Sequence, residues 1–186
     1  MNTLQKSNDH IKNPSLERLI VYFNKIKGET RKESKFDYLD SIISVVGVFL
    51  AVSIICILAF SSNYSMVIGP LGASCILVFA AHNGPLSQPR QVIGGYILST
   101  VTGILIWSIF GKSLFIIILS LVIVLILMAI TKTIHPPAAA SALVAINFET
   151  GWGYLIPVFI GIFLLVFVSM VYNNLFPKRQ YPKYWL

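Results

Sequence analysis

The residues best suited to chemistry stand in the stretch TKTIHPPAAASALVAINFETGW, residues 131–152, which places a histidine and two prolines at the head of a short apolar run. Proline lacks a backbone N–H and fits the first turn of a helix, so His135-Pro136-Pro137 predicts a helix that begins near Pro136 and continues through Ile146. Its roughly twelve residues rise about 18 Å, little more than half a bilayer. The free N–H groups and positive dipole at such a helix start would bind an anion, and we expect this start to lie at membrane depth.

A second short apolar segment, residues 64–81, is interrupted at Gly69-Pro70. With Pro70 aligned on Pro136, GPLGASCILVFA (69–80) lies over HPPAAASALVAI (135–146), a shift of 66 residues. A long apolar segment precedes each short one and another follows it. This order predicts two inverted repeats of three segments, each with a proline-broken half-helix; chance similarity between apolar sequences is the alternative.

The two half-helix starts together predict an anion-binding site at the membrane midplane. His135 either donates a hydrogen bond to the anion or carries a proton with it, since its charge changes near neutral pH. The alternative is a neutral histidine that caps unwound backbone. His82 and Asn83, beyond the other short segment, are interpreted as ordinary loop residues. The predicted substrate-binding residues are His135, Pro136, Pro137, Ala138, Gly69, Pro70, Gly72 and Ser74.

Two cations flank these segments. Arg90 stands in HNGPLSQPRQVIGG (82–95), a loop rich in turn formers that Pro85 and Pro89 stiffen. It is either a positive-inside anchor or an electrostatic attractor of anions at a cytoplasmic mouth, and Lys132 would serve the same mouth.

The elements that must position these residues are apolar helices. The chain is 56% hydrophobic and 11% charged, against roughly 45–50% and about 25% in soluble domains. Four segments are long enough to span a bilayer: 41–60, 91–110, 113–131 and 154–176. In the second of them Gly95, Ser99 and Gly103 recur every four residues, which predicts a close helix contact. The expected fold class is an all-α, polytopic integral membrane helical bundle.

Charge predicts the organisation of the chain: a cytoplasmic polar head (1–36), a transmembrane domain (37–177) and a cytoplasmic tail (178–186). In the head, Asn13-Pro14 and Gly28 delimit an amphipathic helix that lies either on the anionic leaflet or on the protein's own cytoplasmic face. Positive ends place both termini in the cytoplasm. Six crossings, with Arg90 and Lys132 inside, obey the positive-inside rule better than four crossings with re-entrant short segments.

Other classes of function find little support in the sequence. It contains no H-E-x-x-H, G-x-S-x-G or P-loop motif, and no acidic residue lies within a span, so we expect no enzyme. The ligands of a metal site are not clustered, and we expect neither a metal nor a cofactor. Basic residues form no stripe, which argues against nucleic acid as a partner. The expected partners are a small inorganic anion and the lipid bilayer; six short spans enclose little volume, so we also expect a homo-oligomer.

At GPLGAS, PLSQPRQVIGG and HPPAAASAL the sequence resembles the HPP family of integral membrane proteins, over roughly residues 37–176. The resemblance implies four membrane-spanning helices and a transporter or channel for a small inorganic anion, nitrite first, since plastid and cyanobacterial relatives are linked to nitrite transport. It carries function to the loop motif Gln88, Pro89, Arg90 and to the HPP triplet. Residues 138–140 are alanines where glycine is common in the family, which would narrow the backbone's approach to a ligand.

We expect the protein in a bacterial plasma membrane. The rival hypothesis is a non-transporting membrane scaffold or signalling partner that acts through its amphipathic N-terminal helix.

Overall fold

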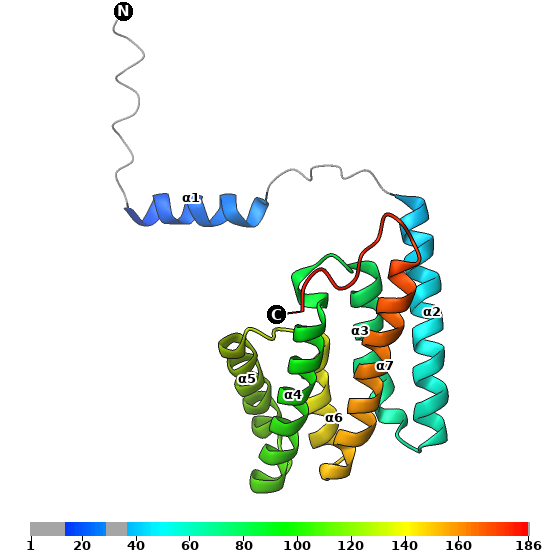
Figure 1. Cartoon of the computed structure of the whole chain (residues 1–186). Helices are drawn as coiled ribbons and strands as arrows, with labels where there is room; N and C mark the ends of the chain where they lie inside the picture. Colours follow the sequence, from blue (N-terminus) through cyan, green and yellow to red (C-terminus); the bar gives the residue numbers. More distant parts are fainter. Residues whose placement is uncertain (1–13, 29–36, 186) are drawn as a thin grey trace, which may run out of the picture. The chain divides into compact units, whose positions relative to one another are not determined.

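The computed structural model describes residues 14–28 and 37–185, and every regular element there is helical (Figure 1). The all-α fold class is therefore confirmed. The two described parts belong to two separate compact units, which divide between residues 36 and 37. The helices are α1 (Pro14–Lys27), α2 (Tyr38–Ser61), α3 (Ile68–Ala80), α4 (Pro89–Phe110), α5 (Leu114–Thr131), α6 (Pro136–Asn147) and α7 (Leu155–Asn174), with the 3₁₀ turns η1 (Ser65–Val67), η2 (Pro85–Ser87) and η3 (Trp152–Tyr154).

Helix α1 has the predicted limits. Pro14 occupies the first helical position, and Gly28, with φ +68°, ends the helix in the left-handed conformation that glycine adopts without strain. The apolar side chains Leu19, Ile20 and Phe23 are exposed. The predicted cap Asn13 lies outside the described residues.

The second unit presents an apolar exterior. Four of its described helical segments are long and apolar enough to cross a membrane: Tyr38–Ser61, Pro89–Phe110, Leu114–Thr131 and Trp152–Asn174. Large apolar side chains such as Phe49, Phe115 and Phe163 are exposed on their outer faces. Because a water-soluble surface rarely carries so much contiguous apolar area, this unit is a membrane-embedded bundle.

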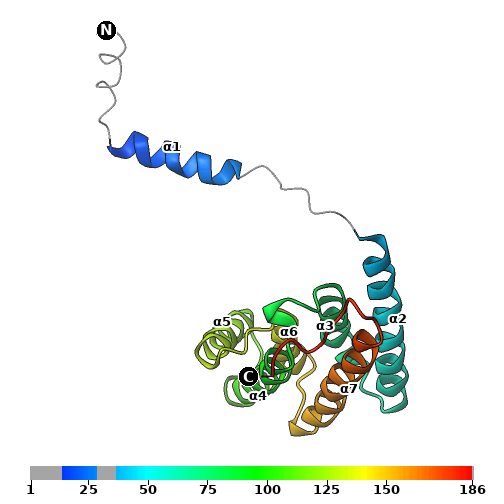
Figure 2. The same ribbon diagram turned by 45° about the horizontal axis from the view of Figure 1, so that its top comes forward.

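Helices α2 to α7 alternate in direction (Figures 1 and 2). Ser44, near the start of α2, donates a hydrogen bond to the Phe79 carbonyl at the end of α3, and Tyr172, near the end of α7, donates to the Ile43 carbonyl. At the opposite end, Trp107 of α4 donates to the Thr150 carbonyl beyond α6. We call the end that holds the starts of α2, α4 and α6 the tail end. We call the opposite end the far end.

The short helices α3 and α6 thus join opposite ends of the bundle instead of turning back. Both are shorter than the four spanning candidates, so the number of membrane crossings, six or four, stays a prediction. Each half of the bundle has the order long helix, short helix, long helix, and a 3₁₀ turn precedes both α4 and α7.

Two glycines 66 residues apart hold equivalent places in these halves. A Cβ on Gly95 would meet His135 and Ala138 at the start of α6, and a Cβ on Gly161 would meet Leu71 at the start of α3. The agreement favours the inverted repeat, which stays a prediction.

The predicted small-residue contact of Gly95, Ser99 and Gly103 is confirmed. Ser99 Oγ donates to the Ala138 carbonyl, and a Cβ on Gly103 would lie 2.6 Å from the Cα of Ala142. Helices α4 and α6 therefore run parallel with their backbones in near contact.

Residues 178–185, in the predicted cytoplasmic tail, belong to the same compact unit as the helices of the bundle. Arg179 is only 5% exposed and donates to Asp40 Oδ1 at 2.7 Å. Its other donors reach Asn173 Oδ1, Ser44 Oγ and the carbonyls of Phe79 and Asp40. Since all five N–H groups are used, this buried cation is fully compensated, and it joins the ends of α2, α3 and α7.

In a chain with Cys56→Ala and Cys75→Ala, we expect Lys132→Cys and Lys112→Cys to react from opposite sides of the membrane. Both positions are exposed, Lys132 at the tail end and Lys112 at the far end. The positive-inside rule predicts that the tail end is cytoplasmic. Labelling with an impermeant maleimide in inside-out and right-side-out vesicles measures this, with Asn83→Cys as a control that must agree with Lys132→Cys. Reaction of both lysine positions from one side would contradict the alternation.

Candidate functional site

His135 is fully buried at the N-cap of α6, between the loop of η2 and helix α3. Its Nδ1 lies 2.8 Å from the Leu86 carbonyl oxygen, and its Nε2 lies 2.8 Å from Ser74 Oγ. A carbonyl only accepts hydrogen bonds, so Nδ1 carries a proton and donates it to Leu86. In the neutral ring, Nε2 then accepts from the Ser74 hydroxyl.

The chain of hydrogen bonds continues into α4. Ser74 Oγ lies 2.8 Å from the Tyr96 hydroxyl, and because the Ser74 proton points to His135, Tyr96 donates to Ser74. Ser74 is fully buried and Tyr96 is 1% exposed. The result is one directional chain from Tyr96 through Ser74 and His135 to the Leu86 carbonyl.

A second set of buried hydroxyls extends the path toward the far end. Thr100, one turn beyond Tyr96 on α4, lies 2.8 Å from Ser141 Oγ of α6. Ser141 Oγ lies 3.4 Å from the Tyr154 hydroxyl, which comes from η3 at the far end. We call the six residues His135, Ser74, Tyr96, Thr100, Ser141 and Tyr154 the polar seam. It lies between α3, α4 and α6, and partners within the bundle offset the cost of burying these hydroxyls.

The start of α6 does not offer the free N–H groups that the sequence analysis expected. Pro136 and Pro137 have no N–H, and the Ala138 N–H donates to the His135 carbonyl at 3.0 Å. The two prolines that mark the helix start therefore also remove its backbone donors. Pro136 is exposed, Pro137 is half-buried, and Ala138 is buried against α4.

The start of α3 does not join that of α6 in one site. Leu71 packs beside Gly161 near the far end, whereas His135 contacts the tail-end loop. Gly69 is exposed, Pro70 is buried and Gly72 is half-buried, and a Cβ on either glycine would meet nothing within 4 Å. Segments that run in opposite directions place their starts near opposite ends, so of the predicted α3 residues only Ser74 meets His135.

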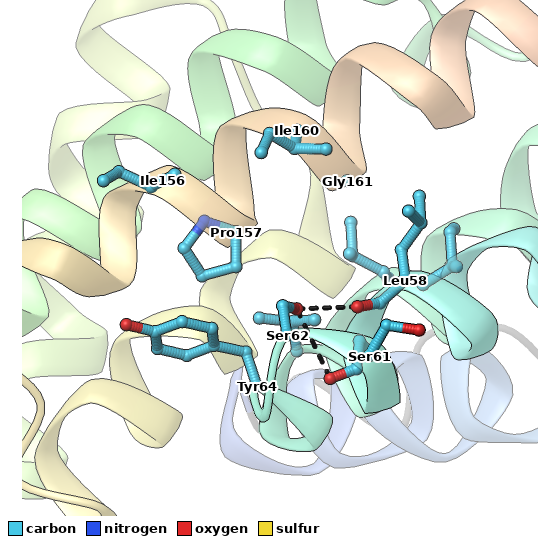
Figure 3. Close-up of a pocket in the computed structure, with 12 residues that line it drawn as sticks. Leu58, Ser61, Ser62, Tyr64, Ile156, Pro157, Ile160 and Gly161 are labelled. Atoms are coloured by element: carbon cyan, nitrogen blue, oxygen red, sulfur yellow. Dashed lines mark hydrogen bonds between the residues drawn. The ribbon is translucent and has the colours of Figure 1, made fainter.

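The pocket beside the start of α3 is apolar. It has a volume of about 230 Å³ between the end of α2, η1 and the start of α7. Figure 3 shows Ile156, Pro157 and Ile160 of α7 on one side of it and Leu58 and the Ser61–Tyr64 segment on the other. The Ser62 hydroxyl donates to the Leu58 carbonyl of its own helix. This lining does not suit an inorganic anion.

A family model described as HPP, transmembrane region, matches residues 33–182. The chain belongs to the HPP family. It is also similar to two transmembrane proteins of Dictyostelium discoideum. One is 32% identical over 136 residues, 68% of this chain and 48% of the relative, and the other is 28% identical over 179 residues, 89% of this chain and 58% of the relative. The chain therefore spans about half the length of the curated relatives it matches. No solved structure matches it.

Membership of the HPP family confirms the predicted resemblance and, with the apolar helices, makes this an integral membrane protein. The HPP triplet supplies His135 to the polar seam at its tail end, where this ring joins α6 to α3 and to the loop of η2.

The second HPP-family motif, Gln88-Pro89-Arg90, ties the loop of η2 to its neighbours. Gln88 is fully buried; its Nε2 donates to the carbonyls of His82 and Gly84, and its Oε1 accepts from the Lys183 N–H of the tail. Pro89 is the first residue of α4. Arg90 is half-buried and donates to the Thr131 carbonyl at 3.2 Å, which is the contact an anchor would make.

Lys132, by contrast, is exposed at the end of α5, with φ +57°. Of the two predicted anion attractors, it is the one with its charge in solvent.

Four residues of the polar seam were missed by the sequence analysis: Tyr96, Thr100, Ser141 and Tyr154. Tyr96 and Thr100 are four residues apart, one helical turn on α4, directly beside the small-residue face that was recognised. Their hydroxyls were the available signal, because two polar groups on a buried face of a membrane helix require partners.

Proposed function

We propose that this HPP-family protein transports a small inorganic anion across the membrane along the polar seam, with nitrite as the first candidate. The observation that carries the proposal is two sets of buried neutral donors, His135–Ser74–Tyr96 toward the tail end and Thr100–Ser141–Tyr154 toward the far end, with Tyr96 and Thr100 one helical turn apart on α4. An anion that sheds water needs donors along its route, and hydroxyl groups supply them by rotation. No Asp or Glu occurs between residues 41 and 148 to repel it.

In the described arrangement each seam hydroxyl donates to, or accepts from, its neighbour, so the path is closed. An anion would enter by accepting a hydrogen bond that one seam residue now donates to another, for example when Tyr96 turns its O–H away from Ser74. Nitrite presents two oxygen acceptors on one nitrogen and can accept from two adjacent hydroxyls. The dipole of α6 adds attraction at His135, while its backbone N–H groups contribute nothing.

Transport by purified protein in liposomes tests this function. We expect nitrite uptake above that of protein-free vesicles, with nitrate, formate and chloride as competitors that rank the anions. Ser74→Ala and Tyr96→Phe should each reduce uptake. Ser120→Ala is the matched control, because Ser120 is a fully buried serine of α5 outside the seam. No uptake of any anion, or an equal loss in the control, would overturn the proposal.

We expect Lys132→Gln to slow uptake more at low salt than at high salt. Lys132 is exposed, and the Debye length falls from about 30 Å at 0.01 M to about 10 Å at 0.1 M, so added salt should remove its advantage. Arg90→Gln should reduce uptake equally at both salt concentrations, because Arg90 is held by the Thr131 carbonyl. Initial rates in liposomes at the two salt concentrations measure both effects. An effect of Lys132→Gln on uptake that does not change with salt would show that Lys132 does not attract the anion.

We further propose that the protein acts as a homo-oligomer without enzymatic activity or cofactor, with both termini cytoplasmic in a bacterial plasma membrane. The scaffold hypothesis is favoured by one feature, the exposed apolar residues of α1. Deletion of residues 1–35 separates the two functions, since transport along the polar seam should survive it.

A further inference from the structure

His82 is buried without a hydrogen-bond partner for its ring. The side chain is 5% exposed, and neither Nδ1 nor Nε2 makes a hydrogen bond. The Phe79 backbone carbonyl acts on the ring as a hydrogen-bond acceptor would and raises its pKa, but it does not meet the geometry of a full hydrogen bond with either nitrogen. A neutral imidazole offers one donor and one acceptor, so this position lacks one partner of each kind.

The ring lines a pocket of about 390 Å³ at the tail end, between the start of α2, the end of α3 and the residues that follow α7. Its charged side chains have both signs. Arg179 is saturated by its five acceptors, one of which is Asp40 Oδ1, and Asp37 Oδ1 accepts from the Asp40 N–H. The second carboxylate oxygens of Asp37 and Asp40 and the Lys178 ammonium are left to face a ligand.

The pocket stands at the level of lipid headgroups. The spanning segments Tyr38–Ser61 and Trp152–Asn174 reach the tail end within a few residues of it, so the apolar runs stop where its charged residues begin. Leu39, Ile43 and Phe176 give the same pocket an apolar part. A phospholipid likewise joins a charged headgroup to hydrocarbon.

We propose that this pocket binds the headgroup of a phospholipid that carries both a phosphate and a primary ammonium group. The phosphate accepts from Lys178 and from the N–H of His82. The ammonium donates to the Asp37 or Asp40 carboxylate and to the second nitrogen of His82, so the zwitterion supplies both partners that the ring lacks. The acyl chains lie along Leu39 and Ile43 of α2.

The state of His82 suits this role. Burial lowers the pKa of the imidazole, the nearby Arg179 cation lowers it further, and Lys183 acts in the same direction, against the opposing effects of Asp40 and the Phe79 carbonyl. The ring is therefore neutral at pH 7, with one donor and one acceptor to offer.

Native mass spectrometry and thermal unfolding of the full chain in nanodiscs test the proposal. In phosphatidylcholine discs, added phosphatidylethanolamine should stay bound and raise the melting temperature, whereas added phosphatidylglycerol should not, because it lacks the ammonium group. Phosphatidylcholine itself has no N–H to donate. Lys178→Gln, at an exposed position, should weaken retention about tenfold, as expected for loss of one charge-assisted contact.

Two further variants keep the test decisive. Asp37→Asn retains an N-cap for α2 and removes one carboxylate, and His82→Phe fills the same space without polar atoms. All variants should melt like the wild type in pure phosphatidylcholine. Retention of phosphatidylethanolamine by all three variants would overturn the proposal, as would equal retention of the three lipids. A melting shift with soluble phosphoethanolamine but not with the lipid would overturn the assignment to lipid.

Discussion

We expect His135→Asn to lose nitrite uptake by about tenfold while His135→Gln keeps most of it. The asparagine amide nitrogen takes the place of Nδ1 and keeps the hydrogen bond to the Leu86 carbonyl, whereas the glutamine amide reaches the place of Nε2 and keeps the contact with Ser74. Only the second contact belongs to the chain that leads into the bundle. One hydrogen bond is worth roughly 1–1.5 kcal/mol, close to a factor of ten in rate.

Both variants should be folded and inserted, which thermal unfolding in detergent checks. His135→Leu lacks both contacts and should lose most of the flux. If His135→Asn transports as well as His135→Gln, His135 is a structural cap and the polar seam is not the route. If His135 carries a proton, His135→Gln and His135→Leu should be equally damaging to acid-driven uptake, and both should spare passive anion exchange.

Gly103→Ala should destabilise the bundle by about 1–3 kcal/mol, the usual cost of overpacking a core. The added methyl group would lie 2.6 Å from the Cα and 2.9 Å from the carbonyl oxygen of Ala142. These are backbone atoms that cannot rotate away, so α4 and α6 would have to separate, and the hydrogen bond between Thr100 and Ser141 would stretch with them.

Gly72→Ala is the matched control for this substitution. Gly72 is also a helical glycine of the bundle, but a methyl group there would meet nothing within 4 Å. Because alanine has the higher helix propensity, by up to about 1 kcal/mol, Gly72→Ala should be neutral or stabilising. Melting temperatures in one detergent compare the two, and equal values would show that α4 and α6 do not depend on this close approach.

The sequence predicted the helices well because their signals are local. Pro14 and Gly28 delimit α1, apolar length defines the spanning segments, and the spacing of Gly95, Ser99 and Gly103 identifies the face of α4 that α6 covers. Each of these features depends on residues within a few turns of one another.

The site was predicted only in part because its contacts join distant segments. The pairing of Ser74 with His135 brings together residues 61 positions apart, and the sequence analysis assigned both to the site without the direct contact between them. Arg179 was interpreted only as part of a positive cytoplasmic end, and its buried ion pair was not predicted because its carboxylate partner Asp40 lies 139 positions away. The residue pattern marks a helix start but not its position along the bundle axis, so it did not predict that Ser74 is the residue of α3 that lies beside His135.

The tail has a mechanical consequence. The Lys183 N–H donates to Gln88 Oε1, and the Tyr181 hydroxyl donates to the Ser87 carbonyl. The adjacent Leu86 carbonyl accepts from the His135 ring. These hydrogen bonds link the tail, through residues 86–88, to the imidazole of His135. A protein that pulled on residues 183–185 would thereby move a group deep in the bundle without entering it, and a probe attached there would sense that movement from the surface.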